Sequence, residues 1–216
     1  MSSQLIEFAN EKFYAYPNCA LYWKRLNVII VADLHLGKSI SFAKQKQFLP
    51  PYDTMETLEK LFKCINKFEP SKLIIVGDLL HDIFSIQSFQ KRDYENFNEY
   101  SKKTEFIWVK GNHDSDVHIR GFNKVLDYEI DEIIFNHIPI ETSNFQICGH
   151  YHPKRKISHR GKSIYKPSFV HNDNLLILPS FGTLTGGMNI DKEPLKQLLG
   201  KNTKVFPVGN ERVYKL

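Results

Sequence analysis

The chain of 216 residues is 42% hydrophobic and 25% charged, an ordinary composition for a globular protein with a sizeable core. No apolar run approaches the roughly 20 residues of a membrane-spanning helix, and the three cysteines fit neither a disulfide framework nor a zinc knuckle. These features exclude a membrane span and favour a single domain over residues 1–216 in a reducing, cytoplasmic compartment.

The first half of the chain alternates predicted strands with predicted helices. An apolar strand is expected at residues 28–31, and the stretch DTMETLEKLFKCINKF, residues 53–68, has apolar residues at helical spacing. Asp53 or Thr54 is the expected N-cap of this helix. KLIIVGDLLHD and EFIWVKGNHD each read as a short apolar strand running into a polar turn, and between them a weakly periodic helix is expected over about residues 84–102.

The second half reads as short strands joined by turns. Strands are expected in EIIFN, FQIC, KISH, KSIY, NLLIL, KVFPV and RVYKL, with Arg160–Gly161–Lys162 as one of the turns. A strand–helix–strand beginning followed by a run of strands predicts mixed β-sheets covered by helices.

Polar clusters follow five of the predicted strands. They are DLH at residues 33–35, GDLLHD at 77–82, GNHD at 111–114, NH at 136–137 and GHYH at 149–152. The carboxyl ends of strands form the ligand-binding edge of an open α/β sheet, so these clusters can converge in space.

The side chains in these clusters are imidazoles, carboxylates and one amide, without thiolates. Such donors suit manganese, iron or zinc in a catalytic role and do not suit a structural zinc–thiolate site. Seven of them are too many for one ion that must also leave room for substrate, so they suit two ions that share a carboxylate. The seven are Asp33, His35, Asp78, Asn112, His137, His150 and His152.

The order of these motifs resembles that of the calcineurin-like metallophosphoesterases, which carry D-x-H, GD, GNH[DE], a single His and GH-x-H. Every signature residue of that pattern is present between residues 28 and 153. A narrower resemblance, in ALYW, VADLHLGK, GHYHPK and LPSFGTLTGG, is to the DNA-ligase-associated metallophosphoesterases, which are found beside a ligase and a helicase in DNA-repair gene sets.

The resemblance implies an α/β fold, a four-layer αββα sandwich of two packed mixed sheets flanked by helices. It implies that Asp33, His35 and His152 hold one divalent ion, that Asn112, His137 and His150 hold a second, and that Asp78 bridges them. Manganese is the expected metal, with iron, zinc or magnesium as alternatives. A hydroxide shared by the ions would attack phosphorus.

The same resemblance assigns His113 to assist the leaving group and Asp114 to orient the His113 imidazole. His81 and Lys38 are candidate substrate-binding residues from their positions after the second and first clusters. Three histidines match no family position and are expected at the surface: His118, His159 and His171.

Two acid-free basic stretches begin next to the metal motifs. Residues 34–52 contain three lysines, and residues 151–172 contain six lysines and arginines, whereas the whole chain has a net charge of only +5. This positive charge favours a polyanion, and with the resemblance it predicts a nuclease acting on DNA in repair.

Two alternatives remain open at this stage. The first is a small-molecule phosphodiesterase or phosphomonoesterase, acting for instance on a cyclic nucleotide. The second is a non-catalytic scaffold, of the kind found in the retromer complex. A ligase and a helicase are possible functional partners, no membrane partner is expected, and both a monomer and a homodimer are compatible with the sequence.

Overall fold

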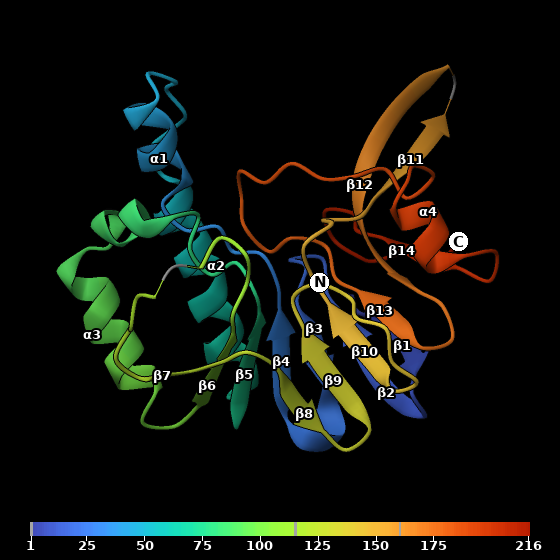
Figure 1. Ribbon diagram of the computed structural model, residues 1–216, viewed down its shortest axis with the longest axis horizontal. Coiled ribbons are helices and arrows are strands. Elements are labelled where there is room, and N and C mark those ends of the chain that lie inside the picture. The colour runs from blue at the N-terminus through green and yellow to red at the C-terminus, as the bar shows by residue number, and fades with distance from the viewer. Residues whose placement is uncertain (1, 115, 160) are drawn as a thin grey trace.

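Two β-sheets lie face to face in the computed structural model, which describes residues 2–114, 116–159 and 161–216, and helices cover their outer faces (Figure 1). This four-layer α/β arrangement is the predicted one. No helix in the described part of the chain is both long and apolar enough to cross a membrane.

The helices and strands have the following bounds. The strands are β1 (Gln4–Phe8), β2 (Glu11–Ala15), β3 (Leu21–Trp23), β4 (Val28–Val31), β5 (Lys72–Val76), β6 (Glu105–Val109), β7 (Phe122–Val125), β8 (Tyr128–Ile130), β9 (Ile133–Asn136), β10 (Phe145–Cys148), β11 (Lys154–His159), β12 (Lys162–His171), β13 (Leu175–Ile177) and β14 (Lys204–Pro207). The α-helices are α1 (Lys38–Lys44), α2 (Asp53–Phe68), α3 (Lys91–Tyr100) and α4 (Leu195–Leu199), and the 3-10 helices are η1 (Lys24–Leu26) and η2 (Ile83–Ser88).

The first sheet has the strand order β1-β2-β3-β4-β5-β6-β7. Strands β4 to β7 are parallel neighbours, whereas β1 to β4 pair antiparallel. All four residues of β4 are buried, as is expected of a parallel strand covered on both faces. The apolar runs of β4, β5 and β6 therefore place three parallel strands side by side, and their carboxyl ends meet at one edge.

The second sheet is also mixed, with the path β11-β12-β13-β10-β9-β8 and with β14 beside β12. Strands β9, β10 and β13 are parallel, and β11 and β12 form an antiparallel hairpin. The carboxyl ends of β9 and β10 lie at the same side of the molecule as those of β4, β5 and β6 (Figure 1).

The main hydrophobic core fills the space between the sheets and continues under α2 and α3. Alternation along β10 shows how the layers form. Ile147 belongs to the central core, whereas Cys148 packs in a second cluster with Leu195 and Leu199 of α4. Neighbouring residues of one strand thus contact different layers, as the period of two requires.

Several elements differ from those predicted. Strands β1 and β2 were not anticipated, and RVYKL forms only isolated bridges, from Arg212 to Ser2 and from Val213 to Val208. The expected helix over residues 84–102 is a 3-10 helix followed by the shorter α3. The predicted capping of α2 is wrong: Tyr52 precedes the helix, and the Asp53 carboxylate instead accepts hydrogen bonds from the backbone N–H and hydroxyl of Ser39.

Candidate metal centre

The five predicted polar clusters converge at the shared carboxyl edge of the two sheets. The first sheet supplies residues after β4, β5 and β6, and the second supplies residues after β9 and β10. The seven candidate ligands are distributed over these loops as follows: Asp33 and His35 after β4, Asp78 after β5, Asn112 after β6, His137 after β9, and His150 and His152 after β10. Residues far apart in the sequence are therefore neighbours.

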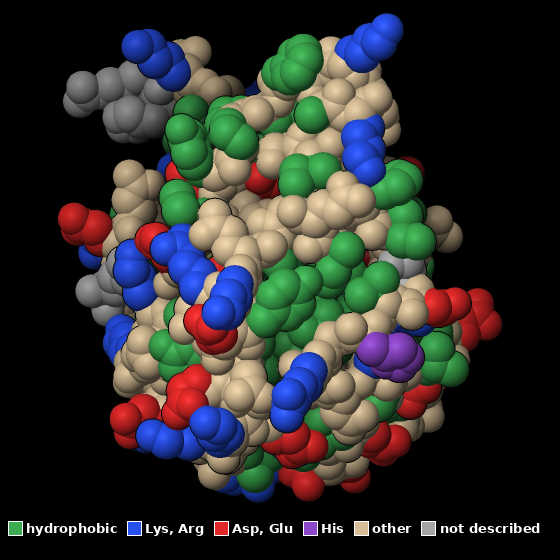
Figure 2. Space-filling view, turned by 90° about the vertical axis from the view of Figure 1, so that its left-hand side faces the viewer, with side chains coloured by type: hydrophobic (Ala, Val, Ile, Leu, Met, Phe, Trp, Pro, Cys, Tyr) green, Lys and Arg blue, Asp and Glu red, His purple; other side chains and the backbone are tan. Residues whose placement is uncertain are grey.

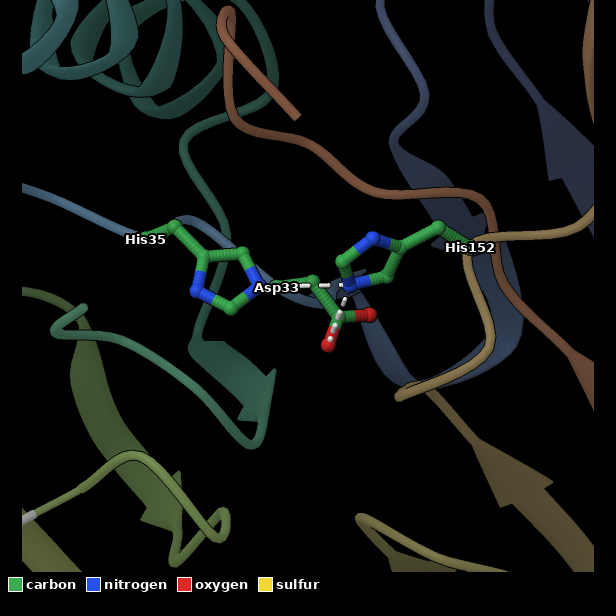
Figure 3. Close-up of side chains that lie close together, drawn as sticks. All are labelled: Asp33, His35 and His152. Carbon is green, nitrogen blue, oxygen red and sulfur yellow. Dashed lines mark hydrogen bonds and ion pairs between the residues drawn. The ribbon is translucent and has the colours of Figure 1, made fainter. Parts of the chain in front are cut away.

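One group of potential metal ligands consists of Asp33, His35 and His152. Figure 3 shows these side chains pointing toward one another. The Nε2 atoms of His35 and His152 are 3.2 Å apart, and His152 Nε2 is also 3.2 Å from Asp33 Oδ1. Asp33 is fully buried, so its carboxylate is presented from inside the fold.

A second group consists of Asp78, His137 and His150. His137 Nε2 lies 3.3 Å from Asp78 Oδ2 and 3.2 Å from His150 Nδ1. The amide oxygen of Asn112 is 2.9 Å from the same His137 nitrogen, so it joins this group.

Asp78 lies between the two groups. Its Oδ2 atom is 3.3 Å from His137 Nε2 and 3.7 Å from His35 Nε2. Its Oδ1 atom accepts a hydrogen bond of 3.0 Å from the backbone N–H of His113. One carboxylate oxygen is thus held by the β6 loop while the other faces ligands of both groups.

The donor set fits divalent ions. Two nitrogens that bind one ion at about 2.1 Å lie about 3–3.4 Å apart, which is the separation seen between His35 and His152. Burial lowers the pKa of His35 to about 2, so its ring is neutral and able to ligate. Burial raises the pKa of Asp78, but the hydrogen bond and charge of His137 outweigh it and bring that pKa down to about 2.

Five of the seven candidate ligands have a positive φ, a backbone region that non-glycine residues rarely adopt. The angles are 55° for Asp33, 45° for His35, 46° for Asp78, 69° for His150 and 44° for His152. Such conformations cost of order 1–3 kcal/mol each and gather at functional sites. The packing and hydrogen bonds of the surrounding sheets keep these residues in the strained backbone conformation.

The glycines of three motifs make room for ligands from other motifs. A Cβ on Gly77 would lie 1.9 Å from His137 Nδ1, and one on Gly111 would lie 2.1 Å from Asp78 Oδ1. A Cβ on Gly149 would lie 2.6 Å from Asp33 Oδ2. Each of these glycines therefore allows close packing against a side chain of a different loop.

His113 is exposed beside the two groups, but its neighbours differ from those predicted. Its Nδ1 atom is 3.0 Å from the backbone carbonyl oxygen of His81, and its ring stacks on the His81 ring at 5.3 Å. The carbonyl of His81, rather than Asp114, therefore orients the His113 imidazole. This contradicts the orienting role predicted for Asp114.

Asp114 is buried and braces the loop backbone instead. Its carboxylate accepts hydrogen bonds from the backbone N–H of Gly111 at 2.7 Å, from that of Leu80 at 3.0 Å and from Trp108 Nε1 at 2.8 Å. Burial raises the pKa of Asp114, against the lowering effect of these hydrogen bonds. Asp114 ties the loop after β6 to the loop after β5, where Asp78 lies.

The remaining predicted residues have varied positions. Lys38 begins α1 directly after the first motif, and burial lowers its pKa. His118 is exposed, as predicted, and the side chain of His159 lies outside the described residues. The prediction for His171 is wrong: it is 3% exposed, because β12 turns it inward to stack on Phe206 at 5.7 Å.

A segment over residues 178–187, here called the strap, supports the site and had no role in the ligand prediction. The Ser180 hydroxyl donates a hydrogen bond of 2.7 Å to the backbone carbonyl of Asp33, and the Gly182 N–H donates to the same oxygen at 3.1 Å. Lys60 of α2 donates to the carbonyl of Phe181. The small residues in SFGTLTGG were the available signal, since a Cβ on Gly182 would lie 2.3 Å from the Leu34 carbonyl oxygen.

Comparison with known proteins agrees with this architecture. The family model for calcineurin-like phosphoesterases matches residues 26–202. The crystal structure of the Pseudomonas putida nuclease MPE is similar with a TM-score of 0.75 and 22% sequence identity over 100% of both chains. The E. coli phosphoesterase Yfce has a TM-score of 0.44 and 14% identity, over 85% of this chain and 88% of its own.

A search of curated proteins found no match. The family match covers most of the chain and includes all the loops that form the two ligand groups. The chain therefore belongs to the calcineurin-like phosphoesterase family and is a metal-dependent phosphoesterase.

Proposed function

We propose that the chain is a two-metal-dependent phosphodiesterase that acts as a nuclease on DNA, with manganese as the metal. The observation that carries the proposal is the pair of adjacent ligand groups with Asp78 between them. The basic residues beside the first and last motifs favour a polyanionic substrate. The name of the Pseudomonas putida neighbour, a nuclease, points the same way.

Under this proposal Asp33, His35 and His152 hold one ion, and Asn112, His137 and His150 hold the other, with Asp78 shared. Two divalent ions would neutralise a phosphodiester and lower the pKa of a nucleophilic water. The exposed Asn112 and His113 form the solvent-facing part of this centre, where a phosphodiester can approach.

His113 is the proposed proton donor. Because its Nδ1 atom faces the carbonyl of His81, Nδ1 carries a proton and the other ring nitrogen, Nε2, is the one that can exchange its proton. A protonated His113 can pass the Nε2 proton to the leaving oxygen.

The wider setting proposed for this enzyme follows from its resemblance to the ligase-associated group. It comprises a cytoplasmic role in DNA repair, in functional association with a ligase and a helicase, by a chain that acts as one domain. Ligands from both sheets in each group support the last point.

The function is tested by restoring manganese to metal-stripped protein and following hydrolysis of a chromogenic phosphodiester and of the matching monoester. We expect manganese-dependent cleavage of the diester, faster than that of the monoester, followed by cleavage of DNA oligonucleotides. Cleavage of the monoester alone would reject the nuclease proposal in favour of a phosphomonoesterase. No cleavage with manganese, iron, zinc or magnesium would favour a scaffold.

The role of His113 is tested by His113→Ala. We expect a loss of turnover of about 100-fold or more, which is the usual contribution of a general acid. Metal content, measured by atomic absorption, should stay near that of the wild type, because His113 belongs to neither ligand group. Turnover equal to that of the wild type would show that another residue supplies the proton.

A further inference from the structure

The hairpin of β11 and β12 projects beyond the sheets on the side where the strands bearing the metal centre end (Figure 1). Its pairing assigns residues to its two faces. Lys156 lies opposite Tyr165, and Ser158 lies opposite Ser163, with their hydroxyl oxygens 2.8 Å apart. Cross-strand partners share a face, so Lys154, Lys156 and Tyr165 lie on one face, here called the lysine face.

The opposite face of the hairpin borders a hollow beside the carboxyl-terminal residues. Ile157, Ile164 and Lys166 line a hollow with the carboxyl-terminal residues Tyr214 and Leu216. On the same face, Arg155 forms an ion pair of 2.7 Å with Asp191. This face therefore turns toward the carboxyl-terminal segment, and one of its cations is already paired with an acid.

The lysine face is positively charged and unpaired. The hairpin sequence contains no acid from residue 154 to residue 171. Among the described residues neither Lys154 nor Lys156 forms an ion pair, and Tyr165 is 52% exposed. By contrast, on the side of the molecule that carries α3, basic side chains are interspersed with acidic ones (Figure 2).

The lysine face begins at the metal centre. Lys154 follows His152 by two residues, and its backbone N–H donates a hydrogen bond of 2.7 Å to the carbonyl of Met188, next to the strap. Lys156 lies two residues further along β11 on the same face, so the lysine face extends outward from the loop that bears His152.

We propose that the lysine face of the β11–β12 hairpin is a binding arm for a nucleic-acid strand, whose phosphates meet Lys154 and Lys156 while a base stacks on Tyr165. This inference rests on the proposed function, because it names where a polynucleotide extends from the metal centre. The enzyme therefore selects polynucleotides over small phosphate esters.

The dimensions of the hairpin suit this role. The six residues of β11 extend about 20 Å at about 3.3 Å per residue, which is the length of about six nucleotides of a stacked strand at about 3.4 Å each. Lysine contacts to phosphate and stacking of a base on an aromatic ring are the two interactions that hold single strands without sequence preference.

The arm is tested by comparing Lys156→Ala/Tyr165→Ala with Lys166→Ala, which removes a charge from the opposite face of the same hairpin. Binding of a fluorescein-labelled 20-nucleotide strand is followed by anisotropy in EDTA, so that no turnover occurs. We expect the double variant to bind at least about tenfold more weakly and its salt slope to fall by about 1. Lys166→Ala should change binding less than about threefold. Tyr165→Phe, used in place of Tyr165→Ala, should keep the stacking of a base on the aromatic ring.

The outcomes distinguish the arm from the proposed function. With manganese restored, the ratio of kcat/KM for the strand to that for a chromogenic diester should fall in the double variant. Equal weakening by Lys166→Ala and by the double variant, or wild-type binding by the double variant, would overturn the arm. If the wild-type protein cleaved neither substrate, the proposed nuclease function would be rejected. The binding measurements in EDTA would still test whether the hairpin binds a nucleic-acid strand.

Discussion

The backbone of His152, with a φ of 44°, has a conformation that disfavours any side chain, by roughly 1–2 kcal/mol relative to glycine. We expect His152→Gly to be more stable than His152→Ala in the absence of metal. Glycine relieves this strain, but its greater conformational freedom stabilises the unfolded state by about 0.4–1 kcal/mol. The free energy of unfolding of His152→Gly should therefore exceed that of His152→Ala by about 0.5–1 kcal/mol. Urea unfolding of both variants in EDTA measures the difference.

Both variants should lose metal-dependent turnover, because His152 belongs to the first ligand group. A His152→Gly variant no more stable than His152→Ala would show that the left-handed backbone at this position is not strained.

At the scale of single residues, the sequence predicted which side chains gather but not every contact. Adjacent histidine and aspartate in GNHD suggested that Asp114 orients His113, yet the two side chains have different partners. The partner of His113 is a backbone carbonyl, which no residue pattern identifies. His171 was wrongly predicted to lie at the surface. Strand β12 begins in an exposed hairpin and ends in a buried sheet, so its residues change from exposed to buried along the strand.

At the scale of elements, the strap connects the hydrophobic core to the metal centre, because Phe181 is buried in the core and Ser180 bonds to the backbone of Asp33. We expect Ser180→Ala to weaken manganese binding about tenfold, because its hydrogen bond fixes the backbone of Asp33, and loss of such supporting contacts typically costs 10–100-fold. Calorimetric titration of manganese measures the change.

Ser168→Ala is the matched control. Ser168 is also buried, but its hydroxyl donates to the carbonyl of Lys166 in β12, a strand that carries none of the candidate ligands. Equal manganese affinity in Ser180→Ala and Ser168→Ala would mean that the strap does not position Asp33.

The elements predicted best were β4, β5 and β6, because strands buried on both faces are continuous apolar runs. Strands β1 and β2, the outermost pair at one side of the first sheet, were missed because exposed or half-buried polar residues interrupt their apolar ones. RVYKL alternates like a strand but forms no strand pairing. The backbone N–H groups of Tyr214 and Leu216 donate to carbonyls of β14, but the segment's only bridges are isolated ones at Arg212 and Val213.

At the scale of the whole molecule, each ligand group joins the two sheets. Asp33, His35 and Asp78 come from the first sheet, whereas His137, His150 and His152 come from the second. We expect manganese to stabilise the fold, since a ligand at a hundredfold excess over its Kd adds about 2.7 kcal/mol per site. Two sites would add about 5 kcal/mol.

Urea unfolding with manganese and with EDTA, followed by the fluorescence of the buried Trp23 and Trp108, measures this gain. Asp33→Asn/Asp78→Asn should abolish most of the difference, which controls for manganese bound elsewhere. An unfolding midpoint that does not respond to manganese in the wild type would contradict binding between the sheets.

The close approach of Gly77, Gly111 and Gly149 to ligands from other loops limits how this site can change over evolution or by design. A larger residue at any one of them would displace a ligand that belongs to another motif. The motifs are therefore not independent modules, and a grafted GD or GH-x-H segment would bring the glycine without the side chain that it accommodates. Transfer of this chemistry to a new scaffold requires all five loops to be moved together, as one interlocking part.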